Sequence, residues 1–232
     1  MFRRAIFCMA EPIVISLGGS AFVKETIDTA FLAKFAEIIK PLAKKGQVFI
    51  YVGGGRTARA YQETLAKLGG SEKSRDLIGI YATRLNAQLL KLILGKECEE
   101  EIIEDPTKPI KSNKHILLAG GWKPGWSTDY DAILLAENVK ATAVVNLTNV
   151  DYVYDKDPAK FKDAKHFEKL SWPEYKKIIG GEWKPGLHTP FDPIASKEAE
   201  KAKLKVAILN GANLENFKCY LEGKTFVGTI IG

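Results

Sequence analysis

Short, uninterrupted apolar runs alternate with longer amphipathic segments along most of the chain, which predicts strands alternating with helices. The apolar runs are rich in β-branched residues and predict buried strands at 12–17, 47–52, 115–119, 143–147 and 206–209, with a last strand over 225–231. Most runs are apolar at successive positions rather than at every second one. Both faces are therefore expected to be covered, as in a mainly parallel α/β sheet.

Apolar residues at helical spacing fill the segments between these runs. They predict a helix that Asp28 caps and Gly46 ends, followed by helices over 57–68, 76–94, 129–139, 192–203 and 214–221. In the long helix over 76–94, seven residues are expected to form one apolar face: Leu77, Ile80, Tyr81, Leu85, Leu89, Leu92 and Ile93.

The domain organisation reads as one folded unit over 11–232, preceded by an extension. The sequence contains no repeat and no flexible linker, although the acidic, proline-containing stretch 97–113 separates two halves. Residues 1–10 resemble the start of a signal peptide, but their apolar stretch is short and Glu11 and Pro12 interrupt it. Translation could equally begin at Met9, so no chemistry is assigned to 1–10.

Composition and charge exclude several classes of protein. The chain has 232 residues, of which 46% are hydrophobic and 27% charged, a balance that favours a packed core over disorder. No apolar run approaches the roughly 18 residues of a membrane span. The net charge of +6 is scattered rather than clustered. A phosphorylated small molecule explains it at least as well as nucleic acid, and neither nucleic acid nor a membrane is expected as a partner.

The cysteines and histidines predict neither disulfides nor a metal centre. Cys8, Cys98 and Cys219 lie far apart and are odd in number, and the three histidines lack the spacing of a zinc motif. A reducing cytoplasm and no structural zinc are the expectation.

Glycine loops follow four of the predicted strands, at 18–20, 53–55, 120–121 and 210–211. In open α/β sheets ligands bind at the carboxyl ends of the strands, and glycine lets the backbone approach a phosphate closely. Amide groups at the start of a following helix also favour an anion. Several such loops on one sheet edge indicate more than one phosphate group.

Two phosphate-binding motifs were tested against these loops. The GxxxxGK[ST] motif is absent, whereas residues 53–58 fit the G-x-G-x-x-A dinucleotide pattern. That pattern also requires an acidic residue at the end of the next strand, and the nearest candidates, Glu72 and Asp76, lie at a predicted helix start. Arg56 and Arg59 instead suit direct contact with phosphate, so a nicotinamide dinucleotide is disfavoured.

Two further segments carry candidate chemistry. In residues 120–129, glycine and proline residues predict a tight loop. The segment also carries a lysine, two hydroxyls and two tryptophans, which favours an anion cradle over a plain helix-entry loop. After the strand at 143–147, Asp151, Asp155 and Asp157 offer carboxylates that either organise Mg²⁺ beside substrate phosphates or line a solvated turn.

The order of motifs resembles the amino acid kinase family, and within it the archaeal type of UMP kinase. The motifs are GGS, GGG-R-x-A-R, D-L-x-G-I-x-x-[ST]-R-x-N-A, GG-x-x-PG-x-[ST]-T-D, T-N-V-D-x-V-Y-x-x-DP and DP-x-A-x-K, and they span about 13–231. The resemblance implies a three-layer α/β/α sandwich of the carbamate-kinase type. It also implies a homohexamer, built as a trimer of dimers, that makes UDP from UMP and Mg·ATP in pyrimidine nucleotide (CTP) synthesis.

The resemblance also implies roles for individual residues, with an acceptor half over about 11–140 and an ATP half over about 141–232. The residues expected to bind ATP are Gly19, Ser20, Gly55, Arg59, Thr148, Asn149, Tyr154 and Asp157. Asp76 would accept hydrogen bonds from the UMP ribose. The other residues expected to bind UMP are Gly54, Gly120, Gly121, Trp122, Lys123, Pro124, Gly125, Trp126, Ser127 and Thr128. The catalytic positions would be Asp151, Ser16 and Lys197.

Several positions depart from the family pattern. Ser16 stands where bacterial members carry a catalytic lysine, so Lys123, Arg56 or Mg²⁺ would have to offset charge. Tyr152 replaces the usual glycine on the ATP side. Trp122 and Trp126 replace smaller or polar residues in the acceptor loop.

Two alternatives remain open from the sequence. One is a kinase of the same fold for another acceptor, such as isopentenyl phosphate or an amino acid. The isopentenyl phosphate enzymes carry a histidine in the acceptor half, and no histidine here falls in a glycine loop. The other is a non-catalytic nucleotide-binding or regulatory protein, a hypothesis prompted by Ser16 and the two tryptophans.

Overall fold

A computed structural model of the chain describes residues 11–180 and 189–232, so the expected extension over 1–10 lies outside the described residues. Seven strands form one sheet in the order β3-β2-β1-β4-β8-β9-β7, and β5 and β6 form a separate hairpin. The strands are β1 (Ile13–Leu17), β2 (Val48–Val52), β3 (Ile116–Ala119), β4 (Ala143–Thr148), β5 (Val153–Tyr154), β6 (His166–Phe167), β7 (Lys169–Leu170), β8 (Lys205–Asn210) and β9 (Thr229–Ile231).

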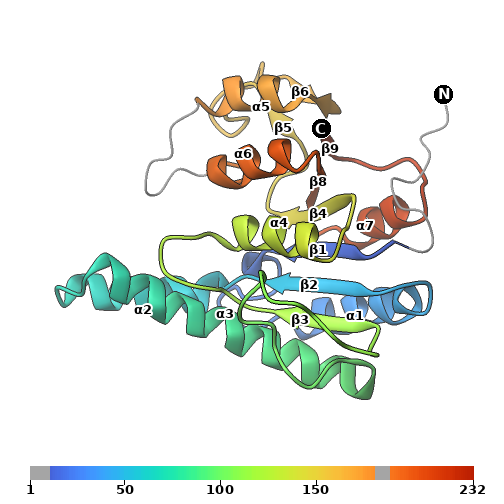
Figure 1. The fold of residues 1–232 in the computed structure, drawn as a ribbon. Helices are drawn as coiled ribbons and strands as arrows, with labels where there is room; N and C mark the ends of the chain where they lie inside the picture. The colour runs from blue at the N-terminus through green and yellow to red at the C-terminus, as the bar shows by residue number, and fades with distance from the viewer. Residues whose placement is uncertain (1–10, 181–188) are drawn as a thin grey trace.

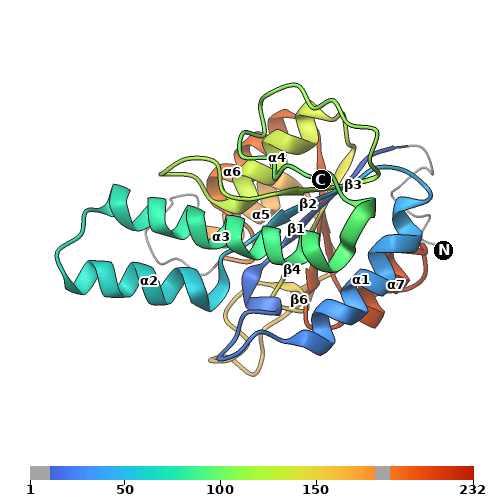
Figure 2. The ribbon, with the colours of Figure 1, turned by 90° about the horizontal axis from the view of Figure 1, so that it is seen from below.

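Helices cover both faces of this sheet, which confirms the predicted three-layer sandwich (Figure 1). The helices are α1 (Thr29–Ala43), α2 (Gly55–Lys67), α3 (Glu72–Leu94), α4 (Thr128–Asn138), α5 (Trp172–Ile179), α6 (Pro193–Lys201) and α7 (Leu214–Leu221), with short 3-10 turns at Gly19–Ala21 and Gly95–Glu97. Helices α1, α3 and α7 pack on one face and α4, α5 and α6 on the other. The hairpin of α2 and α3 projects beyond the sheet (Figure 2).

The buried strands follow from the apolar runs, since successive side chains of a strand point to opposite faces. In β1, Ile15 and Leu17 pack toward α1 and α3, while Val14 packs toward α4. Strands β1, β2, β3, β4 and β8 pair in parallel, so their carboxyl ends share one edge. The chain leaves β1 for β2 on one side and returns to β4 on the other. The edge between β1 and β4 is therefore the switch point at which such sheets bind ligands.

Some elements differ from the sequence prediction. The last strand is antiparallel to β8 and begins at Thr229 rather than at residue 225. Helix α5 and the two-residue strands β5, β6 and β7 were not predicted. A two-residue strand is too short to show a periodic pattern, which explains why these three strands escaped notice.

Helix α3 is longer than predicted, and its expected single apolar face is wrong. It begins at Glu72, because Ser71 caps it by accepting a hydrogen bond from Ser74 N at 3.2 Å. Ile80 is buried, but four of the seven expected residues are exposed: Leu77, Tyr81, Leu85 and Leu92. The buried side of α3 instead carries Gly79, Thr83, Asn86, Ala87 and Leu90. The polar residues Thr83 and Asn86 bond to glycine loops, as described below.

The segment Glu72–Glu97 meets the length and composition of a membrane span, with 44% of its most apolar window buried in the fold. Buried core helices of soluble proteins meet the same test. Here the buried side of the segment packs on the sheet and holds two of its loops. The segment therefore reads as a core helix.

Candidate active site

The two glycine loops after β1 and β2 lie in direct backbone contact. A methyl group at Gly19 would lie 2.2 Å from Gly55 N and 2.5 Å from Gly53 O, distances that no side-chain carbon tolerates. Gly55 has a φ of +59°, a conformation that favours glycine, and a methyl group there would lie 2.7 Å from Gly19 O. The loops after β1 and β2 thus form one continuous backbone cradle above the sheet edge, as the sequence predicted.

Helix α3 fixes the second loop through an amide side chain. Asn86 is buried and its Nδ2 donates to Gly53 O at 2.9 Å and to Gly54 O at 3.1 Å. Both carbonyls are thereby turned toward α3. Asn86 belongs to the D-L-x-G-I-x-x-[ST]-R-x-N-A motif, but no function was assigned to it from the sequence.

The same helix holds the loop after β3, which contains the predicted acceptor residues. Thr83 Oγ1 accepts from Gly121 N at 2.7 Å. Arg84 donates from Nε to Gly121 O at 3.1 Å and from Nη2 to Trp122 O at 3.3 Å. Asp76 Oδ2 accepts from Gly125 N at 2.8 Å. Asp76 is therefore brought to the acceptor loop, and Thr83 and Arg84 are positioning residues that sequence reasoning missed.

The tryptophans of the acceptor loop already have packing partners. Trp126 stacks on Tyr130 with ring centroids 4.3 Å apart, although 37% of the residue remains exposed. Lys123 Nζ lies 3.6 Å from the centroid of the Trp122 ring, a cation–π distance. Ser127 caps α4 by accepting from Tyr130 N, as the predicted helix-entry role requires. The loop is thus both a helix entry and an aromatic wall at the sheet edge.

Asp151, predicted to be catalytic, and Asp157, predicted to bind ATP, lie in different surroundings. Asp151 and Asn210 meet at the ends of β4 and β8, where Asn210 Nδ2 donates to Asp151 Oδ1 at 2.9 Å. The carboxylate of Asp151 also raises the pKa of Tyr154, though less than burial does. Asp157 instead begins a turn of its own, accepting from Ala159 N at 2.9 Å.

Lys197 stands apart from these residues. It is exposed on α6, and no hydrogen bond or ion pair joins it to the described residues of the site. Its predicted role remains a prediction.

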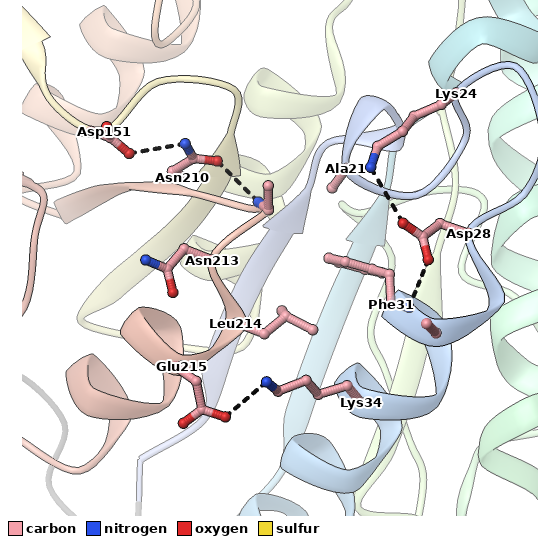
Figure 3. A pocket seen from close by; sticks show the side chains of 12 residues that line it. Ala21, Lys24, Asp28, Phe31, Lys34, Asp151, Asn210, Asn213, Leu214 and Glu215 are labelled. Carbon is pink, nitrogen blue, oxygen red and sulfur yellow. Dashed lines mark hydrogen bonds and ion pairs between the residues drawn. The ribbon is translucent and has the colours of Figure 1, made fainter.

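A cavity of about 490 Å³ opens beside Asp151 and Asn210, between the start of α1 and the start of α7 (Figure 3). Asp151 and Asn210 lie on one side of it, and Lys24 and Asp28 lie on the other, joined by an ion pair of 3.3 Å. Ala21, which also lines the cavity, ends the 3-10 turn that begins at Gly19, so the cavity lies near the loop after β1.

Two cations proposed to replace the missing lysine are engaged elsewhere. Arg56 Nη1 pairs with Glu25 at 3.0 Å, and both side chains are largely exposed. Exposed pairs of this kind contribute little to stability, so Arg56 is free to leave its partner for a phosphate. Lys123 rests on Trp122, as described above.

Two carboxyl groups at the start of α4 were not assigned a role from the sequence. Ser16 is buried and donates to Asp129 Oδ1 at 3.1 Å, and Asp129 Oδ2 accepts from Asp192 N at 3.3 Å. Burial, aided by the charge of Asp192, raises the pKa of Asp129 to about 7. Burial likewise raises the pKa of Asp131, two residues on, to about 7. The signal for Asp129 was available, since this aspartate closes the loop motif at 120–129.

These raised pKa values predict how stability depends on pH. In the unfolded chain both carboxyls titrate near the ordinary value of about 3.9, so between about pH 4 and 7 the folded state binds more protons. The free energy of unfolding therefore falls as the pH rises through this range and levels off above it. We expect the melting temperature of the ligand-free protein to fall by at least about 5 °C between pH 5 and 8.

The measurement is thermal unfolding by circular dichroism at closely spaced pH values. Asp129→Asn and Asp131→Asn should each flatten the slope, whereas Glu174→Gln should leave it unchanged, because the pKa of Glu174 is lowered and its titration lies below this range. A flat profile in the wild-type protein would contradict the raised pKa values.

Comparison with known proteins places this geometry in a family. Residues 11–210 match the family model described as the amino acid kinase family. The uridylate kinase of Methanocaldococcus jannaschii is 42% identical over 86% of this chain and 90% of that protein. The uridylate kinase of Thermoplasma volcanium is 39% identical over 96% of this chain and 98% of that protein.

A solved structure agrees with both. The crystal structure of uridylate kinase from Archaeoglobus fulgidus superposes with a TM-score of 0.81 at 35% identity, covering 95% of this chain and 99% of that one. With paired glycine loops at the carboxyl edge of a parallel sheet and full-length likeness to these proteins, the chain belongs to the amino acid kinase family.

Proposed function

We propose that this protein is a UMP kinase that transfers the γ-phosphate of ATP to UMP, giving UDP and ADP. The observation that carries the proposal is its likeness to proteins named uridylate kinase along nearly the whole chain, at 36–42% identity in those with the strongest matches. The site supports it, because the acceptor loop and the ATP residues lie on the two sides of β1, where two phosphorylated substrates can meet end to end.

The chemistry asks little of the side chains. The phosphate of UMP is already an anion at pH 7, so its oxygen attacks the γ-phosphorus without a general base. The new P–O bond forms as the bond to the β-phosphate oxygen breaks, and ADP leaves with the electron pair. Catalysis then consists of alignment and of neutralising charge on the transferring group. The backbone amides of Gly19 and Gly55 perform both tasks, while the Gly53 amide is bonded to Leu17 O and helps to hold the cradle in place.

Mg²⁺ fits the residues on the ATP side. Asp151 is exposed at the end of β4, and one of its carboxylate oxygens accepts from Asn210 while the other accepts no hydrogen bond from the described residues. Mg²⁺ is commonly held by one or two carboxylates together with substrate phosphates. Asp151 would hold the ion, which supplies positive charge to the phosphates when bound. Because UDP is a pyrimidine nucleotide, the proposed product places the reaction in pyrimidine nucleotide synthesis, and we propose the cytoplasm as its location.

The test is transfer of the γ-phosphate of ATP, with Mg²⁺, to a panel of UMP, CMP, dTMP, AMP and isopentenyl phosphate. Products are separated by chromatography. We expect selective formation of UDP. Transfer to isopentenyl phosphate alone would replace the acceptor, and ATP binding without transfer to any member would leave only a binding role.

We further propose that the protein self-associates through the projecting helices, in line with the expected hexamer. Large apolar side chains line α2 and the outer face of α3, exposed by between 46% and 79%: Tyr61, Leu68, Leu77, Tyr81, Leu85 and Leu92. Leu77, Tyr81 and Leu85 are spaced four residues apart and so share one helix face. A contiguous apolar face of this kind marks an interaction surface, and a second copy presents the same face.

A charge on this face should break the assembly. We expect Leu85→Glu to lower the molar mass in light scattering coupled to gel filtration, with the monomer's melting curve still cooperative. Phe161→Glu is the matched control, because Phe161 is also exposed, at 48%, but lies on a distant loop. A wild-type protein that elutes as a monomer would refute this proposal.

A further inference from the structure

A buried carboxylate lies behind the acceptor loop and takes no part in the mechanism above. Asp131, on α4, is only 1% exposed. Its Oδ2 accepts a hydrogen bond from Tyr51 OH at 3.1 Å and another from Trp122 N at 3.0 Å. One oxygen therefore joins a strand of the sheet to the acceptor loop.

The environment makes this contact specific. Burying a carboxyl group costs free energy that only hydrogen bonds and charge offset. Oδ1 of Asp131 is buried and accepts no hydrogen bond from the described residues, so both of the bonds that hold the group come through Oδ2. The hydrogen bond from the Trp122 amide therefore helps to offset the cost of burying the carboxyl group. Moving the amide away would leave that cost less well offset, so the bond fixes the position of the amide.

The sheet provides the anchor for this group. Tyr51 is fully buried in β2, where it is in register with Ser16 of β1 and Ala119 of β3. Because strands pair with β2 on both sides of Tyr51, its backbone can move only if the centre of the sheet moves too. Helix α3 holds the loop from the opposite side, where Thr83 accepts from Gly121 N and Arg84 donates to Gly121 O and Trp122 O. From the α4 side, Asp131 holds the Trp122 amide and the Tyr130 ring stacks on Trp126.

Trp122 and Lys123 depend on this contact. The Trp122 amide donates a hydrogen bond to Asp131, and Lys123 Nζ lies 3.6 Å from the centroid of the Trp122 ring. Where the Trp122 amide lies therefore decides where an aromatic ring and a positive charge lie at the acceptor side of the sheet edge.

We propose that Asp131 is a positioning residue that, anchored by Tyr51, holds the Trp122 amide and thereby places Trp122 and Lys123 for recognition of the acceptor phosphate ester. The proposal deepens the proposed function and rests on it for the identity of the acceptor, UMP. It concerns the acceptor side alone, since Asp131 makes no contact with the cavity beside Asp151.

Steady-state kinetics with UMP and ATP varied separately give the first test. We expect Asp131→Ala to raise the KM for UMP by about tenfold, while the KM for ATP stays within about twofold. Asp131→Asn keeps an oxygen that can accept from Trp122 N and should restore most of the loss. Tyr51→Phe removes the hydrogen bond that anchors Asp131 but keeps the bond between Asp131 and the Trp122 amide. Its effect should therefore be smaller than that of Asp131→Ala. Equal rises of both KM values in Asp131→Ala would overturn the proposal.

Asn216→Ala is the matched control for lost stability. Asn216 is also buried, and its side chain holds a loop by bonding Val227 N and Val227 O, each at 2.7 Å, far from the acceptor loop. We expect it to lower the melting temperature without changing either KM. If it raised the KM for UMP as much as Asp131→Ala does, a general loss of stability would explain both and the proposal would fail.

A second readout does not depend on activity. In protein labelled with ¹⁵N-tryptophan, the backbone amide resonance of Trp122 reports its hydrogen bond to Asp131, and Trp122→Phe assigns it. We expect this resonance to move in Asp131→Ala while the indole resonance of Trp172, bonded to Leu204 O, stays in place. A Trp122 resonance that does not move would overturn the proposal whatever the acceptor. A moved resonance in a protein that fails to phosphorylate UMP would refute only the proposed function.

Discussion

Replacing Gly19 with alanine is expected to reduce kcat/KM for UDP formation by at least about 1,000-fold. The new methyl carbon would lie 2.2 Å from Gly55 N and 2.5 Å from Gly53 O. Both neighbours are backbone atoms, so neither can rotate away, and the loop after β1 must separate from the loop after β2. The cradle of amides that aligns and neutralises the phosphates would then be lost.

Gly46→Ala is the control for this change. A methyl group at Gly46 would meet only Glu11 O, at the ordinary contact distance of 3.6 Å, so activity should stay near that of the wild type. Circular dichroism should show a folded Gly19→Ala protein with reduced stability, and calorimetry with a non-hydrolysable ATP analogue should show lost binding. A Gly19→Ala protein with at least a third of wild-type activity would contradict the need for close contact between the loops.

The strands that carry the site could be predicted because their signal is local. An apolar run such as 47–52 contains a strand, 48–52, that is buried on both faces, and glycine follows it. Runs of this kind predict the strand, the parallel sheet and the edge where the loops gather. Strand β9 shows the limit. Its pairing depends on β8, from which it is distant in sequence, and no local pattern reports that its direction is antiparallel.

Helix α3 shows why an amphipathic pattern misled. The apolar residues Tyr81 and Leu85 face outward, while Thr83 and Asn86 face inward because they hold the loops of the site. A surface helix usually buries its apolar residues and exposes its polar ones. Helix α3 does the reverse over this stretch, because its inner side supports a polar site and its outer side is apolar. Periodicity alone indicates that two faces exist, not which of them is buried.

The parts of the site that the backbone forms could be predicted from the sequence. The parts that depend on the burial of side chains could be predicted less well. Glycine loops and the resemblance to a family named Gly19, Gly55 and Asp76 from the sequence. The role proposed for Asp131 and the titration of Asp129 depend on what surrounds them after folding, since an aspartate at a helix start ordinarily serves only as a favourable charge. Their raised pKa values come from burial, which no spacing of residues encodes.

The two substrates should respond to different substitutions, which is the second large effect we expect. Asp76→Asn should raise the KM for UMP by at least about 30-fold, because a charged acceptor that holds Gly125 N at 2.8 Å and is proposed to bind the ribose hydroxyls becomes a weaker neutral one. The KM for ATP should stay within about threefold. Arg59→Ala should do the reverse, because Arg59 is exposed on α2, has no ion pair among the described residues and is proposed to contact the ATP phosphates.

The measurement is steady-state kinetics with each substrate varied at saturation of the other. Lys67→Ala is the control for Arg59→Ala, since it removes an exposed positive charge from the far end of the same helix. Asp163→Asn is the control for Asp76→Asn, since Asp163 is an exposed aspartate in an ion pair outside the site. Because the two residues serve different substrates, the double variant should lose the sum of the two single losses in free energy. Two variants that raise the same KM would refute the division of the site into an acceptor side and an ATP side, and with it the paired assignment of Asp76 and Arg59.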